Sequence, residues 1–333
     1  HSLLIDAAYP AFAIVALVLW LALAKYIREQ AMRRSIRSAF GQYLSPVMVD
    51  ALLSDPKQLN LTGESRELSV MFCDIRDFTT LSESYANAPE DLTRFMNQYF
   101  TAMTEQIMER SGTIDKYIGD AIMAFWNAPL EVPDHPRLAC LAALGMTKRV
   151  RELSEEAQAI GADRGPTIRI GVGINSGECY VGNLGSEQRF NYSVLGDPVN
   201  VASRLEGQSK TYGVEIVVGD TTMAVASDLA GLRLDLVRLK GKTQPVWLFG
   251  LLGGAEVARS EAFIALARAH DAMLAAYRRQ DWDGTGRHLT ECRALGEPFR
   301  LGRLYQLYDE RLTTLRQDPP GPGWDGVYFA TSK

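Results

Sequence analysis

The chain opens with an apolar segment whose pattern differs from everything after it. Residues 7–24 contain no charged side chain, and this length meets the lower limit for a helix that crosses a bilayer. Basic residues follow directly, among them Lys25, Arg28 and Arg33, and positive charge after a span marks the cytoplasmic side. We therefore expect a transmembrane helix over residues 1–26 in the inner (cell) membrane, with everything downstream in the cytoplasm. A buried core helix is the alternative.

Residues 27–59 are predicted to couple that helix to the rest of the chain. Neither Gly nor Pro interrupts residues 27–40, and apolar residues recur there in an irregular stripe suited to pairing with a second helix. Pro46 suits the first turn of a further short helix over residues 47–53. Because the chain begins with His1 rather than Met, we expect a longer polypeptide whose upstream sensor domain is absent from this chain.

Two stretches place an acid at the end of an apolar strand pattern. Residues 68–73 form a nearly continuous apolar run that stops at Asp74, as in a central strand. Residues 115–126 form two short apolar runs about Gly119, which permits the positive φ of a tight hairpin and leaves Asp120 at its tip. If the first strand lies beside the hairpin, Asp74 and Asp120 converge at one end of the sheet. Two such carboxylates suit a pair of Mg²⁺ ions on a triphosphate.

The remaining periodicities alternate between helix and strand. They predict helices over residues 82–111, 134–160 and 197–210, strands over 167–174, 178–182, 214–218, 232–239 and 245–251, and a turn at 175–177. This order is typical of an α/β (α+β) sandwich over residues 60–253, with helices on one face of a mainly antiparallel sheet.

The C-terminal residues 254–333 have a different composition, rich in Ala and Arg. We expect a helical extension packed on the preceding domain, with a disordered tail after Pro319. A tandem-repeat binding module is the alternative, but one or two helical hairpins are too few for a freestanding array.

Charge and cysteine content exclude some classes of function. The net charge of −5 argues against a nucleic-acid surface, so no nucleic-acid partner is expected. The four cysteines have neither metal-ligand spacing nor a disulfide pattern, as in a protein of the reducing cytosol.

Three motifs in this order resemble the signature set of the class III nucleotidyl cyclases. They are FCDIRDFT at residues 72–79, DKYIGD at residues 115–120 and YSVLGDPVNVASR at residues 192–204. The resemblance covers roughly residues 60–250 and implies the ferredoxin-like catalytic domain of that family. The flanks resemble bacterial membrane cyclases in which an extracytoplasmic sensor, often of the CHASE kind, is joined by its last transmembrane helix to this domain.

The resemblance assigns a metal and phosphate site to matching residues. Asp74 and Asp120 correspond to the two aspartates that bind a pair of Mg²⁺ or Mn²⁺ ions, with the backbone of Ile75 as a further ligand. The backbone from Ile75 to Thr79, including Phe78, is expected to close over the phosphates of the substrate. If the resemblance misleads, the two aspartates are simply caps at strand ends.

The resemblance also assigns residues that read the purine and hold the triphosphate. Lys116 corresponds to the purine-reading position of adenylate cyclases, and Ser193 stands where many relatives have Asp, as in a subclass that includes bicarbonate-responsive enzymes. A serine oxygen can still accept from the adenine amino group. Lys242, or less probably Lys240, matches the lysine that grips the triphosphate tail; a solvated turn is the alternative.

Asn200 and Arg204 match the pair that orients the ribose and stabilises charge on the transferred phosphate. They are four residues apart, so they share one helix face. A surface ion pair of Arg204 with Glu206 is the alternative.

The resemblance implies an adenylate cyclase that converts ATP to 3′,5′-cyclic AMP and pyrophosphate. In the family, metal aspartates come from one subunit and the purine lysine and Asn/Arg pair from the other, so we expect a homodimer with shared sites. A guanylate cyclase would replace Lys116 by an acid and Ser193 by a small thiol. A catalytically silent membrane signalling partner would lack a metal aspartate or Arg204, and a diguanylate-type cyclase would need a Gly-Gly-acid hairpin.

Overall fold

The computed structural model describes residues 8–41, 49–50, 53, 63–159, 168–186, 190–239 and 244–329. These residues fall into two compact units, His1–Leu59 and Asn60–Lys333, which are treated separately. The predicted helix over 47–53 lies mostly outside the described residues, although Val49, Asp50 and Leu53 are helical.

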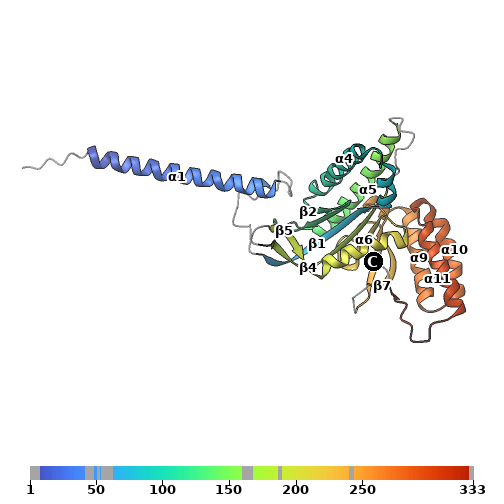
Figure 1. Ribbon diagram of the computed structural model, residues 1–333. Coiled ribbons are helices and arrows are strands. Elements are labelled where there is room, and N and C mark those ends of the chain that lie inside the picture. The colour runs from blue at the N-terminus through green and yellow to red at the C-terminus, as the bar shows by residue number, and fades with distance from the viewer. Residues whose placement is uncertain are drawn as a thin grey trace, which may run out of the picture. The chain divides into compact units, whose positions relative to one another are not determined.

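The first unit contains one long helix, α1 (Ala8–Phe40), of 33 residues (Figure 1). Its segment Tyr9–Met32 has a mean hydropathy of 2.0 and is 0% buried, so by length and composition it is able to cross a membrane. The helix continues without a break through the first part of the predicted coupling segment because neither Gly nor Pro interrupts residues 11–40.

The second unit is built on a mixed sheet whose described strands run in the order β2-β3-β1-β4-β6-β8-β7-β9, with β5 paired to β4. Most neighbours are antiparallel, whereas β4–β6 and β7–β9 are parallel. The bounds are β1 Glu64–Ile75, β2 Thr113–Ile118, β3 Ala121–Trp126, β4 Ile170–Gly185, β5 Phe190–Leu195, β6 Ile216–Gly219, β7 Gly231–Arg238, β8 Val246–Leu251 and β9 Tyr328–Phe329.

Helices cover both faces of this sheet, so the prediction of helices on one face is wrong (Figure 1). Along β1, Met71 and Cys73 join the core under α4 (Pro89–Met108) and α5 (His135–Ala159), whereas Val70 joins the core on the opposite face. There α6 (Asp197–Tyr212) lies directly on β4. The two backbones are so close that a Cβ added at Gly173 would overlap the backbone of α6. Because Gly173 has no side chain, the sheet leaves room for this second layer of helix. The apolar periodicity of the sequence does not reveal this space.

The predicted single helix over 82–111 is wrong, because the chain forms α3 (Phe78–Ser84), a turn, and then α4. Pro89 occupies the first turn of α4, and Ala88 before it has φ −145° and ψ 62°. A proline disfavours helical backbone at the residue before it, so a continuous helix cannot pass through Ala88.

The predicted turn at 175–177 is also wrong, because β4 runs unbroken through these residues. Asn175, Ser176 and Gly177 pair in register with Val70, Ser69 and Leu68 of β1. Pairing with a buried neighbouring strand outweighs the local turn preference of Asn-Ser-Gly.

The C-terminal helices α9 (Glu261–Arg278), α10 (Trp282–Gly296) and α11 (Gly302–Gln317) follow the short helices α7 (Asp220–Val225) and α8 (Ala255–Ala258). The apolar side chains of α9, α10 and α11 share one buried cluster with those of β6, β7, β8 and α6.

The prediction of a disordered tail after Pro319 is wrong for the residues up to Phe329. Trp324 packs 5.2 Å from the Tyr277 ring, and β9 pairs with the edge strand β7. Aromatic contacts and a free strand edge therefore order the tail despite its Pro and Gly residues.

Candidate active site

Two carboxylates meet at one end of the sheet, as the sequence predicted. Asp74 lies near the end of β1, and Asp120 follows Gly119, whose φ of 65° forms the hairpin between β2 and β3. Because β1 and β3 are neighbours, paired as far as Cys73 and Ile122, the carboxylates of Asp74 and Asp120 lie close together. Burial and the neighbouring Asp120 carboxylate raise the pKa of Asp74 to about 7.

The two aspartates line a cavity of about 470 Å³. The predicted phosphate-loop residues Ile75, Phe78 and Thr79 line the same cavity. The backbone N–H of Ile75 donates to Asp74 Oδ1 at 3.0 Å, which fixes the orientation of that carboxylate. The loop after Asp74 and the tip of the hairpin therefore form one site.

Four charged residues of this cavity were not predicted to contribute their side chains to the site, namely Arg76, Asp77, Glu206 and Lys210. Burial raises the pKa of Glu206 to about 6; Arg76 opposes this shift and Asp120 adds to it. Lys210 Nζ lies 3.3 Å from Asp77 Oδ1 in the loop. Glu206 and Lys210 are four residues apart, which places them on one side of α6. This spacing could have indicated that they belong to the site, but only if it were known which side of α6 faces the sheet.

The residues of this cavity fit a pair of divalent cations. Two neighbouring carboxylates repel each other when both are ionised, which is one cause of the raised pKa of Asp74. A divalent ion between them removes this repulsion and prefers oxygen ligands of this kind. Asp74 and Asp120 are the residues that would hold such an ion, with the backbone of Ile75 as the predicted further ligand; among the described residues, no group of three or more His, Cys, Asp or Glu side chains is gathered as a metal site.

Lys116 and Ser193, predicted to read the purine, lie together on neighbouring parts of the sheet. Lys116 Nζ donates to Ser193 Oγ at 3.3 Å, and Ser193 Oγ donates to Asp115 Oδ2 at 2.6 Å. Asp115, which the sequence reasoning missed, is 1% exposed and lies 3.1 Å from Lys116 Nζ. Burial raises the pKa of Asp115, and Ser193 and Lys116 oppose that shift.

Asn200 and Arg204 lie one turn apart on α6, as predicted, but neither lines the cavity of Asp74 and Asp120. Two residues turn a helix by about 200°, so Glu206 points away from the side that carries Arg204. Within the described part of the chain Arg204 has no ion pair, so the predicted alternative, a pair with Glu206, is absent there. Lys240 and Lys242 lie outside the described residues.

Comparison with known proteins identifies the family. The model of the adenylate and guanylate cyclase catalytic domain matches residues 62–250. This chain belongs to that family. The cyclase is 34% identical over 189 residues to "Adenylate cyclase 1" of Rhizobium meliloti (strain 1021), covering 56% of this chain and 28% of the relative. It is 35% identical over 192 residues to "Adenylate cyclase" of Anabaena cylindrica, covering 56% of this chain and 37% of the relative. The chain thus spans about a third of the length of these relatives.

Solved structures include cyclases of both nucleotide types. The adenylyl cyclase CyaB from P. aeruginosa is 31% identical with a TM-score of 0.52, covering 58% of this chain and 96% of that one. The guanylyl cyclase Cya2 is 33% identical with a TM-score of 0.51, covering 59% of this chain and 97% of that one. The class III cyclase fold predicted from the three motifs is confirmed, whereas overall similarity does not separate ATP from GTP.

Proposed function

We propose that this cyclase converts ATP to 3′,5′-cyclic AMP and pyrophosphate in signal transduction. The observation that carries the choice of ATP is the hydrogen bond from Ser193 to the buried Asp115. Ser193 Oγ donates to Asp115 Oδ2 at 2.6 Å, and Lys116 Nζ lies 3.1 Å from the other carboxylate oxygen, Asp115 Oδ1. The hydroxyl proton of Ser193 is therefore committed to Asp115.

With its proton committed, the Ser193 oxygen is left as an acceptor at the purine-reading position. Adenine presents an amino group at N6, which donates, and an unprotonated N1, which accepts from a lysine such as Lys116. Guanine presents O6 and N1–H and reverses both demands. Leaving such groups unpaired costs about 1–3 kcal/mol each, so ATP is preferred.

The phosphates of ATP are proposed to occupy the cavity of Asp74 and Asp120. Two bound Mg²⁺ or Mn²⁺ ions, when present there, would activate the ribose 3′-hydroxyl and neutralise the leaving pyrophosphate. Phe78 and Thr79, in the first turn of α3, are proposed to cover the phosphates, and Lys210 adds a positive charge at the same cavity. Lys242 keeps its predicted role at the triphosphate tail.

The active unit is proposed to be a homodimer with shared sites. Asn200 and Arg204 are absent from the lining of the cavity with Asp74 and Asp120, and so are Lys116 and Ser193. One chain therefore carries two separated halves of the machinery. A two-fold axis would bring the aspartates of each chain next to Lys116, Ser193, Asn200 and Arg204 of its partner.

The cyclase is proposed to sit in the inner membrane through α1, with its catalytic domain in the cytoplasm. The apolar segment Tyr9–Met32 and the basic residues directly after residue 24 support this orientation. An upstream sensor is proposed to act through the helix.

One assay tests the proposed function against its alternatives. Purified protein is given ATP or GTP with Mg²⁺ or Mn²⁺, with Asp74→Asn as the control for contaminating activity. We expect kcat/KM for ATP to exceed that for GTP by about tenfold or more, as the loss of one paired group implies. A reversed preference would make the protein a guanylate cyclase, as the likeness to Cya2 allows, whereas equal values would contradict the proposed selection by Lys116 and Ser193. No turnover would make it a silent signalling partner.

A further inference from the structure

A second cavity lies beside Arg76, which directly follows β1 and is two residues from Asp74. Its volume is about 500 Å³, and it is enclosed by α5, by the turn from Gly213 to Ile216 and by residues 299–301 of the C-terminal extension. Arg76 lines both this cavity and the catalytic cavity. The second cavity, called the rear cavity below, therefore touches the active-site loop without containing any predicted site residue.

The rear cavity carries an excess of positive charge. Its lining has one acid, Glu215, and five basic residues: Arg76, Lys148, Arg151, Arg169 and Arg300. Three of the five are paired: Arg151 with Glu215, Arg169 with Asp77 at 3.6 Å, and Lys148 with Glu152 at 3.9 Å. Among the described residues, Arg76 and Arg300 have no carboxylate partner, and the Nε of Arg76 is buried without any hydrogen-bond partner.

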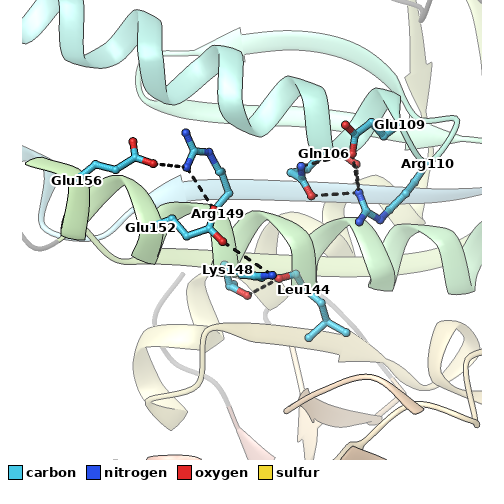
Figure 2. A network of polar contacts seen from close by, with 9 residues as sticks. Gln106, Glu109, Arg110, Leu144, Lys148, Arg149, Glu152 and Glu156 are labelled. Atoms are coloured by element: carbon cyan, nitrogen blue, oxygen red, sulfur yellow. Dashed lines mark hydrogen bonds and ion pairs between the residues drawn. The ribbon is translucent and has the colours of Figure 1, made fainter. Parts of the chain in front are cut away.

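This excess of charge is not a general property of the surface around α5. Figure 2 shows the neighbouring surface of α4 and α5, where Arg149 lies 3.2 Å from Glu152 and 2.8 Å from Glu156. Directly after α4, Arg110 lies 3.6 Å from Glu109. Charges on that surface are balanced locally, whereas the rear cavity keeps unbalanced guanidinium groups.

The lining of the rear cavity also contains a substantial apolar part. Leu144, Ile216, Leu251, Phe299 and Leu301 contribute it. Guanidinium groups match the oxygens of phosphate in geometry and charge, and a volume of this size is within the usual range for small-molecule sites. A ligand that combines phosphate with an apolar or aromatic body would satisfy both parts of the lining.

We propose that the rear cavity is a regulatory site for a phosphorylated small molecule of nucleotide size. The backbone N–H of Arg76 donates to Arg169 O at 2.8 Å, and its guanidinium donates to Val214 O. A phosphate in the rear cavity competes for that guanidinium, and a shift of Arg76 is transmitted along the backbone to Asp74, two residues earlier near the end of β1. Binding therefore changes the turnover of the catalytic site.

Binding is tested by calorimetric titration of the whole chain in EDTA with AMP, pyrophosphate, inorganic phosphate and adenosine as probes. We expect AMP to bind about tenfold or more tightly than adenosine or inorganic phosphate, and the variant Lys148→Gln/Arg300→Gln to lose about tenfold in AMP affinity. Arg149→Gln, on the same helix but outside the lining, is the matched control and keeps wild-type affinity. Wild-type AMP affinity in the double variant, or equal affinities for AMP and adenosine, would overturn the proposal of a phosphate site in the rear cavity. Pyrophosphate binding as tight as AMP binding would overturn the proposal that the ligand has an apolar or aromatic body.

Regulation is tested by steady-state kinetics with AMP as an added effector. Competition at the catalytic site raises KM alone, whereas occupation of the rear cavity changes kcat. We expect AMP to change kcat of the wild type and of Arg149→Gln by about twofold or more, and to leave kcat of Lys148→Gln/Arg300→Gln unchanged. An effect on KM only, or the same kcat effect in the double variant, overturns the regulatory role. Because the titration needs no turnover, its result is independent of which nucleotide the enzyme cyclises.

Discussion

Lys116 Nζ donates to Ser193 Oγ at 3.3 Å, although 77 residues separate the two positions in the chain. The contact arises because β5 pairs with β4 while β2 ends close to β5. Beneath both side chains, Asp115 accepts from Ser193 and pairs with Lys116. The buried carboxylate therefore orients both groups that are proposed to read the purine.

Replacing Asp115 by Asn is expected to weaken the preference for ATP. The amide of Asn is able to donate to Ser193, which frees the serine proton to donate to guanine O6. We expect the ratio of kcat/KM for ATP to that for GTP to fall by about tenfold, corresponding to roughly 1.4 kcal/mol.

The matched control for this experiment is Asp91→Asn. Asp91 pairs with Arg94 on the exposed side of α4, with side-chain exposures of 53% and 69%, and its replacement should leave the ratio unchanged. A ratio that stays at the wild-type value in Asp115→Asn, with the protein still folded, would show that Asp115 has no part in purine selection.

The variant Asp74→Asn is expected to lose activity and to change the way in which the stability of the protein depends on pH. The pKa of Asp74 rises from 3.8 in the unfolded reference to about 7 in the folded protein, so its contribution to stability is full below pH 3.8 and lost as the pH rises to about 7. Without metal, Asp74→Asn should therefore gain more Tm relative to wild type at pH 8 than at pH 4. Its kcat should fall by more than about tenfold.

Thermal unfolding with and without Mg²⁺ checks this prediction. At pH 8, Mg²⁺ should raise the Tm of the wild type and have a smaller effect on Asp74→Asn, because the variant lacks one charged ligand. A Tm difference between the two proteins that does not depend on pH would count against the close contact of Asp74 with Asp120.

Complementation should reveal a site shared between chains. Asp74→Ala and Arg204→Ala proteins, each inactive alone, place both lesions in one site of a mixed dimer and leave the other site intact. Co-expression should restore about a quarter of wild-type activity, since random pairing makes half of the dimers mixed and each of these has one working site of two.

The control pair is Asp74→Ala with Asp120→Ala, in which each chain damages its own metal half. Mixed dimers of these two proteins have a lesion in both sites, so their activity should stay at background. Recovery in the control pair, or no recovery in the first pair despite verified mixed dimers, would mean that each chain builds its own site.

The ion pair of Arg311 with Asp235 is expected to hold the C-terminal extension on the sheet. Their side chains are 9% and 3% exposed and lie 2.6 Å apart, and Tyr212 at the end of α6 donates to the same carboxylate at 2.7 Å. Arg311→Ala leaves this buried charge uncompensated and should lower the free energy of unfolding by about 3–5 kcal/mol. Urea unfolding measures the change.

The exposed pair of Arg303 with Glu310 on the same helix gives the comparison. Its side chains are 44% and 50% exposed, so Arg303→Ala should cost only about 0–1 kcal/mol. A similar loss in both variants would argue that truncation of α11, rather than the buried charge pair, determines the stability of the extension.

Local pattern was sufficient to predict much of the catalytic half of this site. The apolar run before Asp74 and the glycine before Asp120 placed both acids at element ends, and adjacent strands then had to bring them together. The three motifs added the family, and with it the roles of residues that local pattern leaves unassigned.

Long-range packing decided what the sequence could not predict. Asp115 lies at the register irregularity of β2 between Ile114 and Lys116, and the pairing of β5 with β4 brings Ser193 within hydrogen-bond distance of it. Glu206 faces the cavity because the bare surface of Gly173 admits α6 to that face. The tail after Pro319 is ordered by contacts with residues 40 or more positions earlier, such as Arg278 with Asp325.

The ordered tail also gives the protein a built-in optical reporter. Of the five tryptophans, Trp324 lies in the tail and its ring centre is 5.9 Å from that of Trp282 on α10, whereas Trp126 is fully buried in the sheet core. Two indoles at this separation couple their electronic transitions, so release of the tail would alter the near-ultraviolet circular dichroism while the sheet stayed intact. Detachment of the extension is thus distinguishable by spectroscopy from unfolding of the whole domain.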